Sequence, residues 1–468
     1  MKKILLVTIL PLIAMGSIKE DVASIDERLT DIEISNTQQR INVGMEMHMF
    51  AGHISNTNVE NTGVNYNQRH FKNNFRLKFS GVLNQNFQAY ASLQASYLFN
   101  SQVQTRIDSD DDMANPTQGS RPYVRTAYFD WRLNKYTVLS AGRLPTTFGP
   151  PEHLKHGRGR LGTYPLVSFN LPLDGLSLTF TTPKFIPSTD LSFRTIYVPG
   201  GMSDQQQPHK GEPLSASNPA KLAESHEGIT QMVEAVVRPK NKKIFDSLTF
   251  IGQYSFLRFG SFKEFTAPAQ IVKGQYGITD DKNIYRFSAD GPKLADIQIA
   301  TLYLEAQKIL GTKIDAYFSH MRSWNRPVAK INALVINDGN DAAGTGGTDS
   351  LEGQSFEVGQ FVSEGDSQGT RTLYGTRYNF KNSFIGAEFW KTGSTPIPND
   401  LYSDDFIPLG LLAGEVTHIY YTHMFYNNDL SVRVGVQKIH EDKYFQQFNY
   451  AESKQDIRTI YTALFVTY

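Results

Sequence analysis

The chain of 468 residues contains no cysteine, so it can form neither a disulfide framework nor a thiolate metal site. It carries no net charge either, because 46 basic residues balance 46 acidic ones, which argues against nucleic acid as a partner. Beyond its first residues it lacks an apolar run of about 18 residues that could cross a bilayer as a helix. Tryptophan is scarce, yet aromatic residues reach 12% of the chain. That share suits strands with one wet face and one apolar face, bordered by aromatic girdles.

The first residues predict export from the cytoplasm. Lys2 and Lys3 precede the apolar stretch Ile4 to Met15, and Ala14-Met15-Gly16 supplies small residues at a cleavage position. This is the layout of a secretory signal peptide, which we assign to residues 1–16. An exported chain without a membrane-spanning helix is periplasmic, released, or a β-barrel.

Residues 17–39 predict a short helix with a coiled-coil pattern. Its two apolar heptad positions are filled by Val22 and Leu29 and by Ile18, Ile25 and Ile32. Two heptads are too few for a stable isolated coil, because helix nucleation is costly. The segment is therefore either the periplasmic seam of a homotrimer or a single amphipathic helix packed on its own barrel, and the sequence leaves both open.

From Val43 onward, apolar and polar residues alternate. The clearest pair of runs, Phe71 to Leu83 and Phe87 to Phe99, is joined by the turn Asn84-Gln85-Asn86 and predicts a hairpin. At roughly 13 residues, its strands are longer than those of most soluble sheets and suit tilted membrane strands. Sixteen runs follow this pattern, at residues 43–51, 71–83, 87–99, 123–133, 136–143, 175–181, 189–198, 229–238, 247–259, 295–309, 313–324, 370–380, 383–390, 416–425, 430–439 and 457–468.

The connections between these runs alternate between short and long. Short links fall near residues 84, 134, 182, 239, 310, 381 and 426, and long polar ones cover 52–70, 100–120, 144–174, 199–228, 260–293, 325–369, 391–415 and 441–455. The pattern predicts an all-β protein in which residues 41–468 form one 16-stranded antiparallel transmembrane barrel, with both termini in the periplasm. The runs 175–181 and 189–198 are short and flanked by prolines, so 14 or 18 strands remain open.

The last strand, Ile457 to Tyr468, is predicted to close the barrel by pairing with residues 43–51. Its alternation assigns four side chains to the lipid face and to the signal read by the barrel-assembly machinery: Ile460, Leu464, Val466 and Tyr468. Thr459, Ala463 and Thr467 then face the lumen, together with Tyr461 and Phe465, two inward aromatic residues that the pattern does not explain. The terminal aromatic residue resembles the last-strand signature of bacterial outer-membrane barrels.

Together with this ending, the stretches RTAYFDWRLNKYTVLSAGRLP (Arg125–Pro145) and YGTRYNFKNSFIGAEFWKTG (Tyr374–Gly393) resemble bacterial general-diffusion porins. The chain is closest in style to poorly characterised proteobacterial porins, some of which carry a short coiled coil after the signal. The resemblance implies a homotrimeric outer-membrane channel of a Gram-negative bacterium that passes small hydrophilic solutes or ions by passive diffusion. It implies no cofactor and no particular solute.

Sixteen strands enclose a lumen that side chains cannot fill, and in general porins the third outer loop folds into it. Here that loop is 144–174. It carries basic residues where the porin pattern expects acidic ones. The candidate pore-lining and constriction residues are Arg76, Lys78, Arg132, Arg143, His153, Lys155, His156, Arg158, Arg160, Arg377 and Arg433.

A ring of cations at a narrowing favours anions, so the charges of these candidates predict a weak anion preference. The alternative is that they form a network with acidic residues across the barrel, among them Glu46, Asp130, Glu234 and Glu388.

Other functions find less support in the sequence. The motifs GxSxG, HExxH and GxxxxGK[ST] are absent, so we expect no enzyme, and an outer-membrane lipase or protease is the alternative with the least support. His153 and His156 lack a third ligand at a suitable spacing, so we expect no metal site. An adhesin or structural surface protein stays an alternative, because the loop 325–369 is long enough to form a binding surface.

Overall fold

The computed structural model describes residues 41–57, 67–99, 123–168, 170, 173–182, 186–199, 227–260, 265–268, 284–289, 293–327, 330–337, 355–360, 367–393, 412–426, 429–446 and 449–468. The signal peptide expected at 1–16 and the helix expected at 17–39 lie outside these residues. Among the helices of the described part, none is long and apolar enough to span a membrane.

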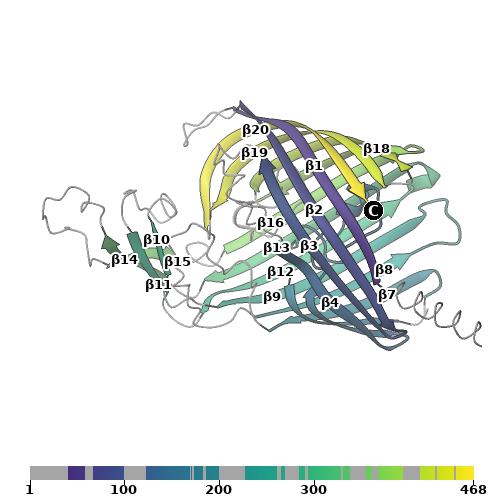
Figure 1. Cartoon of the computed structure of the whole chain (residues 1–468), viewed down its shortest axis with the longest axis horizontal. Coiled ribbons are helices and arrows are strands. Elements are labelled where there is room, and N and C mark those ends of the chain that lie inside the picture. The colour runs from purple at the N-terminus through teal and green to yellow at the C-terminus, as the bar shows by residue number, and fades with distance from the viewer. Residues whose placement is uncertain are drawn as a thin grey trace, which may run out of the picture.

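Sixteen strands form one closed antiparallel barrel, which confirms the predicted fold class (Figure 1). Each strand pairs with its neighbours along the chain, except that β10 and β11, and later β14 and β15, leave the barrel for a separate sheet described below. The strands are β1 (Ile41–Thr57), β2 (Asn67–Asn84), β3 (Phe87–Phe99), β4 (Tyr123–Asn134), β5 (Thr137–Leu144), β6 (Leu173–Thr181), β7 (Thr189–Val198), β8 (Glu227–Val237), β9 (Ser247–Gly260), β12 (Lys293–Gln307), β13 (Ile314–Pro327), β16 (Ser367–Asn379), β17 (Ser383–Thr392), β18 (Leu412–Phe425), β19 (Leu430–Gln446) and β20 (Asn449–Thr467). The two doubtful runs are thus strands β6 and β7.

The barrel closes between its first and last strands. β20 pairs antiparallel with β1, with Leu464 opposite Met49, as the terminal alternation predicted. Backbone hydrogen bonds of 2.8 Å run in both directions between Met45 and Tyr468. Because a shift of one residue would turn every side chain of β20 to the other face, this register also determines which residues of the strand face outward.

The outward face of the barrel is apolar. Ile419, Val436 and Ile460 lie side by side on β18, β19 and β20 and are 54%, 48% and 61% exposed. Their chain neighbours on the inner face are buried: Gln437, Thr459 and Tyr461, for example, are at most 2% exposed. Apolar side chains outside and polar ones inside invert the pattern of a soluble protein, and a closed barrel leaves no edge, so the molecule is a transmembrane β-barrel.

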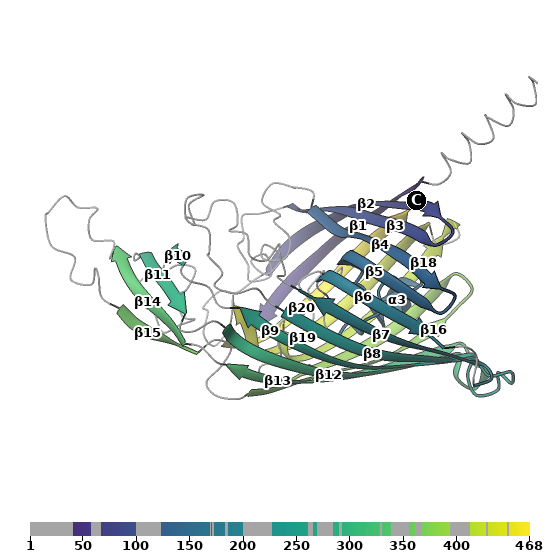
Figure 2. The ribbon, with the colours of Figure 1, turned by 90° about the horizontal axis from the view of Figure 1, so that it is seen from below.

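Two segments predicted as unstructured outer loops contain strands. Residues 260–293 include β10 (Phe265–Pro268) and β11 (Ile284–Ala289), and residues 325–369 include β14 (Lys330–Asn337) and β15 (Ser355–Gln360). These four strands form a separate sheet in the order β10-β11-β14-β15, beyond the barrel end that lies away from the C-terminus (Figure 2). The sequence did not predict this sheet, because its central strands β11 and β14 come from two different connections. Strands so far apart in the chain give no local hairpin signal.

The predicted loop 441–455 is also mostly strand. β19 continues to Gln446 and β20 begins at Asn449, so the hairpin is longer than the membrane-type alternation indicates. Here the backbone ladder continues although the sequence is polar, because a sheet outside the bilayer needs no apolar face. β1 and β2 likewise reach further into the predicted loop 52–70.

A charge on the outer face tests the membrane orientation of the wall. We expect Val436→Lys to lower the free energy of unfolding by about 2–4 kcal/mol, because the lysine would face lipid near the middle of the wall. The measurement is urea unfolding of the barrel refolded into lipid bilayers, with Val436→Ala as the control for lost side-chain volume. Equal urea midpoints for the two variants would contradict the assigned outer face.

Candidate functional site: the lumen and its inner loop

The segment between β5 and β6 lies inside the barrel. It contains one short helix, α3 (Glu152–His156), which Figure 2 shows enclosed by the strands. Side chains and carbonyls of this segment, the inner loop, contact inward-facing residues of many strands, among them Glu46 on β1, Glu234 on β8, Glu305 on β12, Arg377 on β16, Glu388 on β17 and Arg433 on β19. The inner loop is therefore attached to most of the circumference.

Lys155 anchors the centre of the inner loop. Its Nζ lies 3.1 Å from Glu388 Oε2, and both side chains are fully buried. Glu388 also accepts a 2.5 Å hydrogen bond from the Tyr317 hydroxyl, and its other oxygen lies 3.3 Å from His418 Nδ1. A buried charge is tolerated only when it is paired and hydrogen-bonded, and this carboxylate meets both conditions.

Two arginines of the barrel wall form hydrogen bonds with the C-terminal end of α3. Arg377 donates a 2.6 Å hydrogen bond to the Leu154 carbonyl, and Arg433 donates one of the same length to the Lys155 carbonyl. The last carbonyls of a helix have no partner within the helix, so external cations suit them. The helix ends at Gly157, whose φ of 64° is left-handed; a Cβ there would come within 2.8 Å of the Phe384 ring.

The remaining basic residues of the inner loop pair with acids. Arg158 Nη1 lies 3.1 Å from Glu46 Oε1, and Arg160 forms an ion pair with Glu234. His153 Nε2 lies 3.1 Å from Glu305 Oε2. Within α3, His156 Nε2 lies 2.9 Å from Glu152 Oε1. The cross-barrel network, the alternative weighed from the sequence, is thus present.

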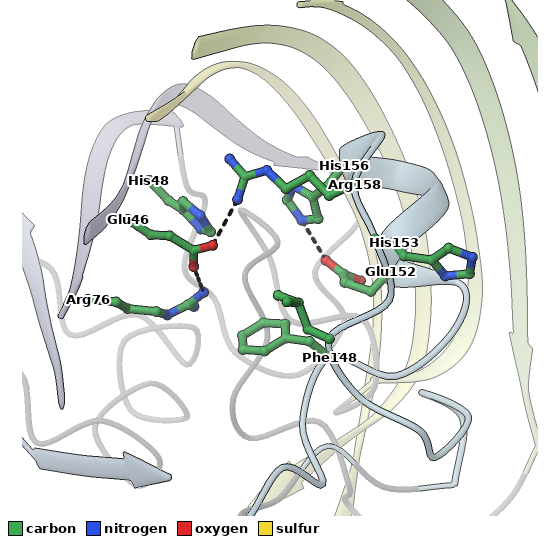
Figure 3. A pocket seen from close by; sticks show the side chains of 10 residues that line it. Glu46, His48, Arg76, Phe148, Glu152, His153, His156 and Arg158 are labelled. Atoms are coloured by element: carbon green, nitrogen blue, oxygen red, sulfur yellow. Dashed lines mark hydrogen bonds and ion pairs between the residues drawn. The ribbon is translucent and has the colours of Figure 1, made fainter. Parts of the chain in front are cut away.

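Three cations converge on Glu46, as Figure 3 shows in part. Arg76 Nη1 lies 3.3 Å, Lys78 Nζ 2.5 Å and Arg158 Nη1 3.1 Å from its carboxylate oxygens. We call Glu46, Arg76, Lys78 and Arg158 the Glu46 cluster. Within the cluster, three basic side chains thus share the one carboxylate of Glu46.

Phe148 of the inner loop holds two arginines of the wall in place. The guanidinium carbons of Arg76 and Arg125 lie 4.4 and 3.6 Å from the centre of its ring. Phe148 has a φ of 57°, a conformation unfavourable for a bulky residue, and its backbone N–H donates to Asn170 Oδ1 at 2.9 Å. The contacts of its ring and this hydrogen bond compensate for that backbone strain.

Tyrosine rings lie across glycines on part of the lumen wall. Tyr317 is in register with Gly375, and Tyr420 with Gly386. A Cβ on either glycine would come within 2.3 Å of the tyrosine ring or hydroxyl, so only glycine leaves room for these rings to lie flat. Tyr461 covers Gly435 in the same way. Tyrosine rings therefore cover the inner side of the sheet at these three positions, on β13 and on β16 to β20.

The same wall explains the two inward aromatic residues of the last strand. The Tyr461 hydroxyl lies 2.8 Å from His418 Nε2, which links β20 to the Glu388 anchor. The Phe465 ring packs edge-on against His48 and His156, with centroids 5.0 and 4.8 Å apart, and Arg433 lies 4.7 Å from its centre. Both rings therefore help to seat the inner loop.

A cavity of about 410 Å³ lies between strands β1 to β4 and the near side of the inner loop. Its lining includes Glu46, Arg76, Lys78 and Arg125, together with Tyr90 and other residues of these strands. A gap of about 20 Å³ next to α3, large enough for about one water molecule, is lined by the residues in Figure 3. The larger of these two cavities thus lies on the side of β1 to β4.

Most of the candidate pore-lining residues face the lumen, but Arg143 does not. It shares the side of β5 that carries Leu139, and its partner Asp174 shares the side of β6 that carries the exposed Leu176. Arg143 makes a two-pronged ion pair with Asp174, at 2.8 and 2.9 Å, on the outward register. Arg132 lies on the inward register near the short turns and is exposed.

Sequence reasoning missed several charged residues of the lumen, among them Arg125, Glu305 and Asp315. Arg125 faces inward only because a bulge in the β3–β4 pairing skips it, and alternation alone assigns it outward. Glu305 and Asp315 fit the inward alternation of their strands, so a systematic search for acids on that register would have found them. Asp315 forms an ion pair of 2.7 Å with Arg377.

Among titratable groups of the inner loop, Tyr164 is nearly fully buried. Burial raises the pKa of its phenol to about 12, although Arg194, 5.9 Å from its ring, acts in the opposite direction. The hydroxyl therefore stays protonated at neutral pH. The described residues contain no group of three or more histidine or acidic side chains that could hold a metal ion.

The sequence matches the family described as "Protein of unknown function (DUF3373)" over residues 64–461, and the chain belongs to this family. None of the curated proteins matches it.

Similar solved structures include three outer-membrane proteins. OprB of Pseudomonas putida has 10% identity and a TM-score of 0.45, with 94% of this chain and 96% of that chain covered. A loop-deletion mutant of OmpT, an outer membrane protein of Vibrio cholerae, has 8% identity and a TM-score of 0.42, covering 91% and 99%. Salmonella typhi OmpF in complex with daunomycin has 11% identity and a TM-score of 0.40, covering 92% and 97%.

Removing the Lys155 anchor tests how the inner loop is held. We expect Lys155→Met to destabilise the seated loop by about 3–5 kcal/mol, because Glu388 would keep a buried charge without its cationic partner. The folded, detergent-solubilised barrel should then be cut faster by trypsin after Arg158 and Arg160. The control is Lys308→Met, which removes an exposed lysine paired with Asp246 in a turn between strands.

Cleavage at the rate of the Lys308→Met control would contradict the anchor. The double variant Lys155→Met/Glu388→Gln should recover part of the protection, because it removes the uncompensated charge.

Proposed function

We propose that this member of the DUF3373 family is an outer-membrane porin of a Gram-negative bacterium, through which small hydrophilic solutes diffuse passively. The observation that carries the proposal is the closed barrel with an apolar exterior, whose interior holds charged side chains and a cavity of about 410 Å³. Membrane barrels have polar interiors whether they are channels or are plugged, so it is the cavity beside the inner loop that favours a channel. We propose no enzymatic role.

In this proposal the inner loop, 144–174, constricts the channel. Its contacts with strands around the barrel favour a fixed constriction over a loop that swings freely. The solute path then runs along strands β1 to β4, where the cavity lies, and passes the Glu46 cluster.

The ion pairs of the lumen bear on selectivity in two ways. Most basic residues of the inner loop have acidic partners, which removes much of the charge excess that the sequence suggested. The Glu46 cluster nevertheless has three cations for one carboxylate, and it lies next to the cavity. We therefore propose a weak anion preference.

Membrane topology and assembly complete the proposal. The short turns and both barrel termini lie at one end, which we assign to the periplasm, and the long connections face outward. Tyr468, 87% exposed at that end, suits recognition by the barrel-assembly machinery. The segment 17–39 remains a proposed trimer seam or a single packed helix, and a homotrimer in outer-membrane lipid is the expected assembly.

Ion selectivity tests this function. In a planar bilayer under a salt gradient, we expect stepwise channel insertion and a reversal potential of the sign for modest anion selectivity. The double variant Arg158→Gln/Arg160→Gln should shift the reversal potential towards cations, because it leaves Glu46 and Glu234 less compensated. Lys135→Gln, in the turn between β4 and β5, should leave it unchanged. A cation-selective wild-type channel would contradict the proposed preference.

The separate sheet of β10, β11, β14 and β15, here called the outer sheet, favours a second candidate function, that of an adhesin or structural surface protein. Four strands from two long connections form an ordered element outside the barrel, which diffusion through the lumen does not require.

Deleting the outer sheet separates the two functions. We expect replacement of residues 261–292 and 328–366 by short glycine–serine linkers to leave single-channel conductance within about twofold of wild type, since long surface connections tolerate change. Binding of whole cells to host or surface material is measured in parallel with conductance. A loss of conductance in a variant that still folds would show that the sheet belongs to the channel.

A further inference from the structure

We propose that the cavity between β1 to β4 and the inner loop is a binding site for small organic carboxylates that carry an aromatic ring. The inference rests on the proposed function and deepens it, because it names the class of solute that the channel favours. It is argued from the charge, the aromatic surface and the size of the cavity.

The lining of the cavity contains more basic side chains than acidic ones. Among the lining residues, Glu46 is the acid, and Arg76, Lys78 and Arg125 are the bases. Arg158 adds a further cation at 3.1 Å from Glu46. A carboxylate that enters the cavity therefore meets a cluster whose cations outnumber its anion, and charge-assisted hydrogen bonds to such groups are stronger than neutral ones.

Lys78 is the cation that a ligand can reach. Its side chain is 36% exposed, whereas that of Arg76 is 3% exposed. The lysine amine lies 2.5 Å from Glu46 Oε1, so it is held at the edge of the cluster while it remains open to the cavity. Since an ammonium group has three donors, it can bind Glu46 and a ligand carboxylate together.

An aromatic surface lies next to this cation. Tyr90 on β3 and Tyr128 on β4 stack with ring centroids 4.9 Å apart and an angle of 20° between the rings, and both line the cavity. The Tyr90 hydroxyl donates a 2.7 Å hydrogen bond to Gln88 Oε1, which fixes the ring. A planar ligand can pack against such a pair, because aromatic rings favour offset stacking and edge contacts.

The size of the cavity fits one small ligand. About 410 Å³ falls within the roughly 300–1,000 Å³ of typical small-molecule sites. A neutral sugar could stack on the tyrosines and accept hydrogen bonds from Lys78, but it lacks the negative charge that would add ionic attraction to the cations. Charge and aromatic surface together therefore favour aromatic carboxylates over neutral solutes.

Equilibrium binding to the detergent-solubilised full-length protein tests the site independently of conductance. Benzoate is the probe, and benzyl alcohol is the neutral control of similar shape, both titrated by ligand-observed NMR. We expect benzoate to bind at least about tenfold more tightly than benzyl alcohol. Lys78→Gln should weaken benzoate binding by about three- to tenfold, as expected for the loss of one partly exposed ion pair. Lys78→Arg should retain binding, and Lys135→Gln should equal wild type.

Equal affinities for benzoate and benzyl alcohol, or undiminished benzoate binding by folded Lys78→Gln, would overturn the proposal. Tyr90→Leu provides a second route: it should weaken the binding of benzoate while leaving the charge of the site intact, and unchanged affinity would count against the aromatic surface. Potassium chloride conductance, measured separately, decides the proposed function. If the protein conducts but does not bind benzoate, the porin proposal stands and the binding site is refuted. If it binds benzoate but does not conduct, the binding site stands and the porin proposal is refuted.

Discussion

The buried ion pair between Lys155 and Glu388 is the interaction on which the lumen depends. Both side chains are fully buried, so each charge offsets the cost of burying the other. If one partner were lost, the remaining charge would be shielded from solvent and uncompensated. The pair holds α3 across the barrel. Once α3 is there, Arg377 and Arg433 reach its carbonyls, and Arg158 reaches Glu46 on β1. The position of the inner loop thus follows from a requirement to pair buried charges.

That requirement also divides the lumen. On the side of β13 to β20, tyrosines lie across glycines and aromatic rings pack under α3. On the side of β1 to β4, the inward residues include serine, threonine, tyrosine, Glu46 and several cations, and the cavity lies against them. A barrel of this size would otherwise hold a wide central channel. The proposed path is therefore lateral, along one wall, and its chemistry is that of four strands rather than sixteen.

Alternation of side chains was sufficient to predict the barrel, because a wall between lipid and water repeats the same constraint at every strand. The partner of β20 and the outward positions of Ile460 and Val466 follow from it. Alternation was insufficient where a bulge, a pairing between distant segments or the folding of a loop determined the position of a residue. Arg125 faces inward through a bulge, β11 and β14 pair across two distant loops, and the partners of the inner loop depend on how it folds in three dimensions. Basic residues in 144–174 indicated a charged constriction, but not which acids would pair with them.

Pairing of most charges has a consequence for selectivity. If the cations of the inner loop were unpaired, their field would act on every ion in the lumen and strongly exclude cations. Because acids of the wall neutralise them at about 3 Å, the field of each pair falls off rapidly with distance, and screening by salt weakens it further. The cations around Glu46 would then act mainly on an anion within contact distance of Lys78. In the function proposed here, weak selectivity for simple ions is combined with local recognition of a carboxylate, and both depend on the same arrangement of ion pairs.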